Sequence, residues 1–176
     1  MKHIKNLTIR AILAAAICVI APFCIPVGSV PITAATLIIF IVSACTDITF
    51  SLPAVFLYII LGAFGLPVFS GFAGGLHIIA GITGGYIIGY IPCAAVIGML
   101  CKKYGEKKFV FPLSMLLGTL ICYFFGTVWH FIVTDGSLIS SAAVCILPFI
   151  AGDVIKIALA SAISIPLRTR LKKFIK

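Results

Sequence analysis

Charged residues are scarce in this sequence, and acidic residues are scarcer still. Only 10% of the 176 residues are charged and only 4 are Asp or Glu, whereas about a quarter of an ordinary soluble domain is charged. Hydrophobic residues account for 62% of the chain. This composition excludes a soluble globular domain, and so few carboxylates argue against a proton relay built from several of them. We therefore expect an integral membrane protein.

Sequence motifs of several enzyme classes are also missing. There is no Gly-x-x-x-x-Gly-Lys-Ser/Thr phosphate loop, no Gly-x-Ser-x-Gly nucleophile elbow and no His-Glu-x-x-His zinc helix. The 7 cysteines include no Cys-x-x-Cys pair, and the 3 histidines form no cluster. We therefore expect no metal and no cofactor. Any energy that the protein uses has to come from a partner or an ion gradient.

The apolar residues fall into long runs, which are typical of membrane-spanning helices. A helix needs about 20 apolar residues to cross a bilayer, whereas a β-barrel would show segments of about ten residues with alternating polarity. The first run has no convincing cleavage site followed by a soluble domain, so we interpret it as a retained span. We predict an all-α polytopic membrane protein with one domain, 1–176. Its six spans are expected at 8–27, 32–50, 53–67, 82–101, 109–133 and 140–167.

The basic residues lie on one side of this predicted topology. The chain has 13 Lys and Arg, and all except Lys156 precede the first span or lie at its start (Arg10), lie between the fourth and fifth spans, or follow the sixth. Because cytoplasmic loops collect Lys and Arg, we expect both termini in the cytoplasm and the connections 26–31, 67–81 and 134–140 outside. The net charge of +9 is then explained by topology, and no nucleic-acid partner is expected.

Two opposite charges interrupt the last predicted span. Asp153 and Lys156 in PFIAGDVIKIALASA are three residues apart and share one helix face. Placing a charge near the bilayer centre costs about 2.5 to 3.5 kcal/mol, so such residues usually face a cavity, a partner charge or a ligand. A structural ion pair that ties this helix to its neighbours is one interpretation. A small-molecule site is the interpretation that we favour.

Glycine is concentrated in the middle of the chain, between positions 65 and 90. The part 67–82 is expected to be an irregular segment on the outer side, between the third and fourth spans, because glycine permits a positive φ and close backbone approach. Such backbone is tolerated at membrane depth only where protein or a cavity covers it, which fits a cap over a site. Gly81, Gly85 and Gly89 recur at every fourth position, a spacing typical of close helix packing.

Four blocks of the sequence resemble one family. They are IPVGSVPIT at 25–33, YIILGAFGLPVFSGFAGGL at 58–76, GITGGYIIGY at 81–90 and PFIAGDVIKIALA at 148–160. In this order and spacing they are similar to the BioY family, the biotin-binding substrate-capture subunits (S components) of energy-coupling factor (ECF) transporters. The sequence departs from the family pattern at Ile82, where the family commonly has proline, and at Ala35 or its neighbour, where it commonly has glutamine.

The resemblance implies a protein of the bacterial cell membrane that captures biotin from the outer side. Uptake would be driven by partners, namely a membrane-embedded coupling subunit and two cytoplasmic ATPase subunits. The chain itself would not be an enzyme.

The chemistry of biotin suggests roles for the intramembrane charges. Its ureido ring has two N–H donors and a carbonyl acceptor, its thiophane ring and valeryl chain are apolar, and its tail is a carboxylate. Asp153 can accept from a ureido N–H, while Lys156 can donate to the ureido oxygen or bind the carboxylate, and the sequence leaves this choice open. Ser70 and Thr83 can add hydrogen bonds. The other expected contacts are with the aromatic residues Tyr58, Phe69, Phe72, Tyr86, Tyr123 and Trp129 and with Gly74 and Gly75.

The first helix has a small-residue face. Ala11 and Ala15 form an Ala-x-x-x-Ala pattern, which lets a neighbouring helix approach closely. The resemblance implies that this face docks on the coupling subunit, whereas ordinary packing within the chain is the alternative.

Two other functions are considered. An S component for another small vitamin is one, and it is distinguished by whether Asp153 and Lys156 face a biotin-sized pocket. An intramembrane enzyme, such as an acyltransferase or a phosphatase, is the other. It would use His77 or His130, and it requires a histidine with a polar orienting partner in the cavity wall.

Overall fold

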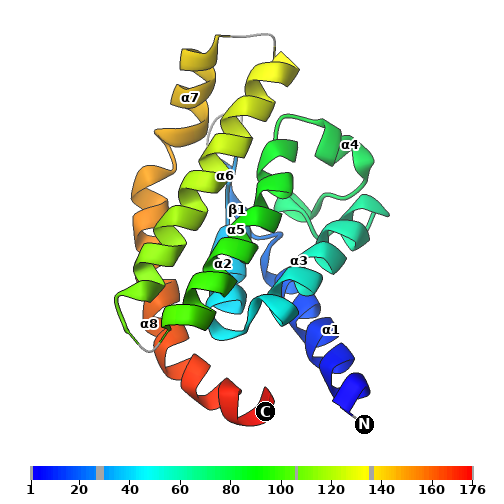
Figure 1. Ribbon diagram of the computed structural model, residues 1–176. Coiled ribbons are helices and arrows are strands. Elements are labelled where there is room, and N and C mark those ends of the chain that lie inside the picture. Colours follow the sequence, from blue (N-terminus) through cyan, green and yellow to red (C-terminus); the bar gives the residue numbers. More distant parts are fainter. Residues whose placement is uncertain (1, 27–29, 106, 135–136, 176) are drawn as a thin grey trace.

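The structure is a computed structural model that describes residues 2–26, 30–105, 107–134 and 137–175, without the side chains of 2 and 172–175. Nearly all of the described chain is helical (Figure 1). Two short antiparallel strands, β1 (Cys24–Ile25) and β2 (Ile32–Thr33), join the first two helices. The helices are α1 (Lys2–Ile20), α2 (Ala35–Cys45), α3 (Ile48–Ala63), η1 (Ser70–Phe72), α4 (Leu76–Ala80), α5 (Gly84–Tyr104), α6 (Val110–Thr134), α7 (Leu138–Ile146) and α8 (Ile150–Ile175).

Four of these helices are long and apolar enough to cross a membrane. They are the segments His3–Ile20, Gly84–Tyr104, Val110–Thr134 and Ile150–Leu171. α2 and α3 are apolar but have only 11 and 16 residues, so each is shorter than a bilayer crossing needs. The structure thus shows a multi-pass membrane protein, and it differs in detail from the six predicted spans.

The largest difference lies in the last predicted span. A single helix over 140–167 is wrong, because the chain breaks between Ile146 and Ile150 into α7 and α8. Pro148 lies in this break; proline has no N–H to donate and disfavours a helical residue before it. As a result Asp153 lies in the first turn of α8 and its N–H donates to the Phe149 carbonyl. The sixth predicted span, 140–167, therefore contains the start of a helix, whereas the sequence suggested the middle of one.

Two predicted spans also have displaced ends. The first span ends at Ile20 rather than at 27, because the chain then enters β1. The second predicted span, 32–50, is shortened at both ends. Its first residues form β2, and α2 ends at Cys45 before α3 begins at Ile48. Two of the predicted outer connections, 26–31 and 134–140, include residues outside those that the structure describes.

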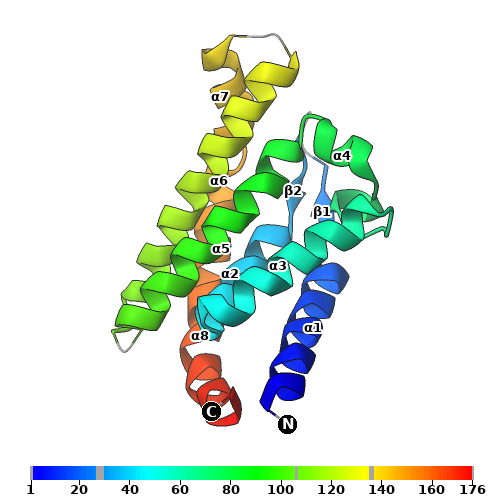
Figure 2. The same cartoon turned by 45° about the vertical axis from the view of Figure 1, so that its right-hand side comes forward.

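The ends of the helices form two groups, one at each end of the molecule. Figures 1 and 2 show the start of α1, the end of α8 and the facing ends of α5 and α6 toward one end of the molecule. α7 and α4 lie toward the other end. The basic stretches of the sequence belong to the first group of helix ends, so the positive charge gathers at one end.

Close packing of α5 on α6 depends on glycine. A Cβ atom on Gly85 would overlap the Phe125 carbonyl and Trp129, and one on Gly126 would overlap the ring of Tyr86. Gly89 faces Phe125 and Cys122 of α6. Gly85 and Gly89 thus pack on a neighbouring helix, as their spacing predicted. Gly81 precedes α5 and serves instead as a hydrogen-bond acceptor, because the Trp129 indole N–H donates to its carbonyl at 2.9 Å.

The chain between α3 and α5 is folded into short pieces. It contains η1 and α4, and Gly71 and Gly75 have φ values of 71° and 106°, which L side chains rarely adopt. The Phe69 N–H donates to the Ala73 carbonyl, and the Gly75 N–H donates to the Gly62 carbonyl. These bonds fold the segment back on the end of α3 and bring Phe69 and Ser70 into the cavity described next.

A candidate ligand cavity with a buried ion pair

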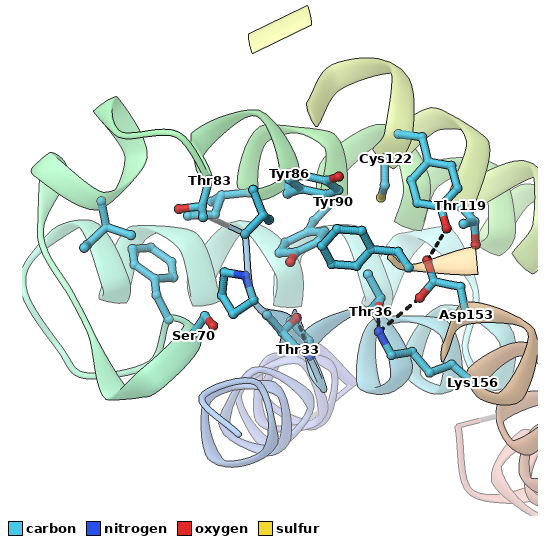
Figure 3. Close-up of a pocket in the computed structure, with 18 of the residues that line it drawn as sticks. Thr33, Thr36, Ser70, Thr83, Tyr86, Tyr90, Thr119, Cys122, Asp153 and Lys156 are labelled. Atoms are coloured by element: carbon cyan, nitrogen blue, oxygen red, sulfur yellow. Dashed lines mark hydrogen bonds and ion pairs between the residues drawn. The ribbon is translucent and has the colours of Figure 1, made fainter. Parts of the chain in front are cut away.

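A cavity of about 220 Å³ lies among the helices. Its wall is formed by α2, α3, α5, α6 and α8 together with residues of β2 and of the segment between α3 and α5. Figure 3 shows Asp153, Lys156 and Thr36 grouped on one side of the cavity, with Ser70 and Thr83 on the opposite side. Tyr86 and Tyr90 lie between these two groups. The cavity therefore has a charged side, an aromatic middle and a neutral polar side.

The charged side is a connected chain of hydrogen bonds. Lys156 Nζ lies 3.0 Å from Asp153 Oδ1 and 3.0 Å from Thr36 Oγ1. The Tyr123 hydroxyl donates to Asp153 Oδ2 at 2.7 Å. Asp153 is only 6% exposed, so these partners replace the water that an ionised carboxylate would otherwise require.

The four members of this network come from three helices. Asp153 lies in the first turn of α8, where the free N–H groups of a helix favour negative charge. Lys156 follows three residues later on the same face. Thr36 lies in the first turn of α2, and Tyr123 lies near the middle of α6. Together with Thr36 and Tyr123, the ion pair thus connects α8 to α2 and α6, which are far apart in the sequence.

Aromatic rings form the middle of the wall. Tyr58 and Phe69 pack edge to face with ring centroids 5.6 Å apart, and Tyr86 packs against Phe149 at 6.0 Å. The Tyr86 hydroxyl donates to the Cys145 carbonyl, so its polar atom is satisfied by α7. These rings offer apolar surface to a ligand, because aromatic side chains bury large areas at low entropic cost.

The neutral side of the cavity has a hydroxyl group without a partner. Ser70 Oγ is buried and forms no hydrogen bond with any residue that the structure describes. Leaving a buried polar group unpaired costs about 1 to 3 kcal/mol. Because Ser70 lines the cavity, a ligand with an acceptor can remove this cost.

Seven of the ten predicted binding residues line the cavity. They are Tyr58, Phe69, Ser70, Thr83, Tyr86, Asp153 and Lys156. The structure brings them together from α3, the α3–α5 segment, α5 and α8.

Three predicted binding residues lie outside the cavity wall. Trp129 packs at the start of α5, where it bonds to Gly81, so it supports the α3–α5 segment from α6 and does not face the cavity. Gly74 lies against the backbone of Gly65 and Leu66. Gly75 does not line the cavity either, and its positive φ belongs to the turn that precedes α4. Phe72, a further aromatic candidate, is 58% exposed and packs on Phe23.

Several polar wall residues are absent from the sequence prediction. Thr36 contacts Lys156 directly, but a single threonine at the start of an apolar helix has no distinctive sequence signal. Tyr123 was expected as an apolar wall residue, and its hydroxyl bond to Asp153 was not foreseen. Tyr90 is detectable, because it follows Tyr86 by one helical turn and shares its face. The other unpredicted polar or sulfur-containing wall residues are Thr33, Thr119 and Cys122.

The histidines do not form a reactive group in this cavity. His130 Nδ1 lies 3.0 Å from Ser141 Oγ between α6 and α7, but neither His130 nor His77 lines the cavity. Within the described residues there is also no group of three or more His, Cys, Asp or Glu that could hold a metal ion. The alternative function, an intramembrane enzyme, requires a histidine with a polar partner in the cavity wall. Neither His77 nor His130 meets this requirement.

The small-residue face of α1 points away from the rest of the protein. Ala11 and Ala15 are exposed, whereas Ala14 and Ile17 are buried against the core. The two alanines therefore do not pack within the described chain, and their face is available to a partner helix.

Comparison with known proteins agrees with this architecture. The sequence model of the BioY family matches residues 1–173. The chain is 37% identical over 171 residues to the biotin transporter BioY of Thermotoga maritima, covering 96% of each protein. It is 30% identical over 164 residues to the biotin transporter BioY2 of Lactococcus lactis subsp. cremoris, covering 92% of this chain and 89% of that protein.

A solved structure has the same fold. The crystal structure of the S-component for biotin from an ECF-type ABC transporter superposes with a TM-score of 0.87 and 29% sequence identity. The match covers 95% of this chain and 92% of that one. The length of the sequence match and the shared fold lead to one conclusion: the chain belongs to the BioY family.

Proposed function

We propose that this protein captures biotin at the outer side of the bacterial cell membrane, as the S component of an ECF transporter. The observation that carries the proposal is the buried Asp153–Lys156 pair in the wall of a partly aromatic cavity. The names of the relatives and of the matching crystal structure, which refer to biotin and to an ECF-type transporter, support it.

The cavity suits the three chemical parts of biotin. Asp153 offers acceptors and Lys156 a donor for the ureido ring. Tyr58, Phe69 and Tyr86 offer apolar surface for the thiophane ring and the valeryl chain. Ser70 and Thr83 offer hydroxyl groups on the opposite side. A polar ligand that enters this cavity thus finds a partner for each of its buried polar groups, which is the condition for burying it without a large cost.

The proposed topology has six crossings within one domain, 1–176, and both termini in the cytoplasm. In it, α2 and α3 each cross with the help of their connections, and α7 and α8 together form the last crossing. The common position of the start of α1, the end of α8 and the α5–α6 ends supports this arrangement (Figure 2). Basic residues at those ends support a cytoplasmic location.

Transport requires partners in this proposal. The chain contains no phosphate loop for ATP, so a membrane-embedded coupling subunit and two cytoplasmic ATPase subunits supply the energy. The exposed Ala11 and Ala15 on α1 form the proposed docking face for the coupling subunit, because small residues allow close helix contact. The protein itself binds and releases its ligand without chemical change.

Equilibrium binding of a vitamin panel to the purified protein tests the proposed function. We expect biotin to bind much more tightly than thiamine, riboflavin, folate or pantothenate, because only its cyclic urea matches the donor and acceptors of the ion pair. Stronger binding of another vitamin than of biotin would assign the protein to a different ligand.

A further inference from the structure

A groove of about 660 Å³ runs between α6 on one side and α7 and α8 on the other, and we name it the α6–α8 groove. Its second rim is formed by apolar residues of 138–146 and 150–157. Leu120 and Phe124 on the α6 rim are exposed, so the groove opens on an apolar face. In a membrane protein such a face contacts lipid chains, which are as apolar as leucine. The α6 rim is the row Leu116, Leu120, Phe124 and Val128, in which each residue lies one helical turn after the previous one.

The dimensions of the groove match one acyl chain. From Leu116 to Val128 the α6 rim extends over about 18 Å, at a rise of about 1.5 Å per residue. One leaflet of the hydrocarbon core is about 15 Å thick, half of the whole core. A neighbouring helix would need small residues for close approach, but within the described chain Ala142 is the only small residue on either rim. A flexible hydrocarbon chain therefore fits the groove better than a helix of another protein or of a second copy.

The wall of the groove contains a hydroxyl group without a partner. Thr127 is 8% exposed and lines the groove, and its Oγ1 is buried with no hydrogen bond to any described residue. Thr119 and Thr134 of the same helix each donate to the carbonyl four residues earlier, so Thr127 differs from both. A buried donor of this kind requires an acceptor from outside the chain. The ester carbonyl of a phospholipid is such an acceptor.

Thr127 also lies at the depth expected of a lipid ester group. α6 has 25 residues and is about 37 Å long, so it extends beyond a hydrocarbon core of about 30 Å. Thr127 lies seven residues before Thr134, the last residue of α6, which is about 10 Å along the helix. Figure 1 shows this end of α6 beside α7, away from the end where the basic residues gather. In the proposed topology Thr127 therefore lies near the outer boundary of the hydrocarbon core.

The groove and the ligand cavity share part of their walls. Thr119, Tyr123 and Asp153 line both. The 2.7 Å hydrogen bond from the Tyr123 hydroxyl to Asp153 Oδ2 is therefore part of a wall between the two. A hydrogen bond to a charged group is stronger where water is excluded. An acyl chain in the groove keeps water from this bond, whereas water in the groove weakens it.

We propose that the α6–α8 groove binds one acyl chain of a phospholipid of the outer leaflet, with Thr127 Oγ1 donating to the ester carbonyl. The same chain covers the Tyr123–Asp153 wall on its groove side and so raises the affinity of the ligand cavity. The first part is independent of the proposed function. The second part rests on it, because it assumes that biotin occupies the cavity.

The amount of phospholipid retained through purification tests the first part. Full-length protein is washed extensively in a detergent with a rigid steroid ring, which does not fit the groove, and the retained phospholipid is quantified by mass spectrometry. We expect about one molecule per chain in the wild type, as for a single concave site. Thr127→Val keeps the shape but removes the donor, so retention should fall by about fivefold or more. Ala142→Trp should retain none, because its ring fills the groove.

Two matched controls accompany these variants. Thr134→Val and Leu113→Trp should retain phospholipid like the wild type, because neither residue lines the groove. A wild-type protein without retained phospholipid, or wild-type retention in Ala142→Trp, would overturn the first part. Equal retention in Thr127→Val and Thr134→Val would overturn the role of Thr127. If Ala142→Trp does not fold, the comparison of the two threonine variants still decides.

Equilibrium binding of biotin to delipidated protein, before and after addition of phosphatidylglycerol, tests the second part. We expect the added lipid to raise the biotin affinity of the wild type by about three- to tenfold. It should leave that of Ala142→Trp unchanged, because the ring already covers the wall. A wild-type affinity that does not depend on added phospholipid would overturn the second part. Absence of biotin binding would instead overturn the proposed function, and the amount of retained phospholipid would still decide the first part.

Discussion

Tyr123 connects the carboxylate of Asp153 to α6 and so fixes its direction within the cavity. Its hydroxyl occupies Oδ2, while Lys156 occupies Oδ1. An aspartate held by two partners has little rotational freedom left to lose when a ligand binds, which favours affinity. We interpret Tyr123 as a positioning residue for the proposed site.

Tyr123→Phe is expected to weaken biotin binding by about tenfold, because it removes one hydrogen bond to a charged group worth about 1.5 kcal/mol. The ring remains, so the aromatic packing is kept. Isothermal titration of the purified variant measures the effect. Tyr104→Phe is the matched control, since Tyr104 is 45% exposed at the end of α5 and should bind biotin like the wild type. Unchanged affinity in Tyr123→Phe would show that this bond does not position Asp153.

Individual residues differ in how far the sequence predicts them. Asp153 and Lys156 are evident, because charges inside an apolar run are costly and therefore rare. Thr36 and Thr119 could not be identified, because threonine is common in membrane helices and its role here depends on which helix lies opposite. Trp129 was placed in the wall because aromatic residues suit a ligand, but its indole N–H required a partner and found one in the Gly81 carbonyl.

At the scale of the elements, Arg168 of α8 links the end of α2 to the end of α5. It is 3% exposed and donates to the carbonyl groups of Ala44 and Cys101. It also contacts Asp47 at 3.3 Å. These bonds give a partner to the Ala44 carbonyl at the end of α2 and a second donor to the Cys101 carbonyl at the end of α5, which also accepts from the Gly105 N–H. The sequence suggested only that Arg168 is one more basic residue near the cytoplasmic end.

Arg168→Ala is expected to lower the stability of the protein by at least about 2 kcal/mol, because several buried carbonyl groups lose a charged donor. The cavity is lined by other residues, so the folded fraction should still bind biotin. The thermal midpoint and the biotin dissociation constant should be measured together. Arg170→Ala, at an exposed position two residues later, should leave both unchanged. A stable Arg168→Ala protein would contradict the role of Arg168 as a link between helix ends.

The elements themselves were predictable to different degrees. Long apolar runs gave α5 and α6 to within a few residues, because hydropathy is sufficient where a helix crosses the membrane without interruption. The break between α7 and α8 was missed although Pro148 was visible, because proline is tolerated in membrane helices and its effect depends on the surrounding helices. This break matters for the site, since it places Asp153 at a helix start.

For the whole molecule, the proposed account has two separate surfaces. The ligand cavity lies among α2, α3, α5, α6 and α8, whereas Ala11 and Ala15 lie exposed on α1. Substitutions at one surface should therefore leave the other intact, because distant sites without shared contacts act independently.

Replacing Ala11 and Ala15 together by Trp should abolish biotin uptake and co-purification with the coupling complex, since bulky rings prevent close helix contact. Biotin binding to the isolated variant should stay at the wild-type level. Uptake by intact cells and co-purification measure the first effect, and equilibrium binding measures the second. Leu113→Trp, on an exposed face of α6, is the control for a new aromatic ring facing lipid. Normal assembly of the double variant would disprove the docking assignment.

The central claim is that the Asp153–Lys156 pair binds the ligand and is not only a structural ion pair. The most direct measurement is the biotin dissociation constant of Lys156→Met, determined beside its thermal midpoint and with Lys103→Met as a control at an exposed position. Methionine keeps the length of the side chain but removes the donor, which leaves a buried acceptor unpaired at a cost of about 1 to 3 kcal/mol. We predict well-folded protein with biotin affinity lower by about ten- to several-hundredfold. Wild-type affinity in folded Lys156→Met protein, with any loss confined to the thermal midpoint, would contradict the account.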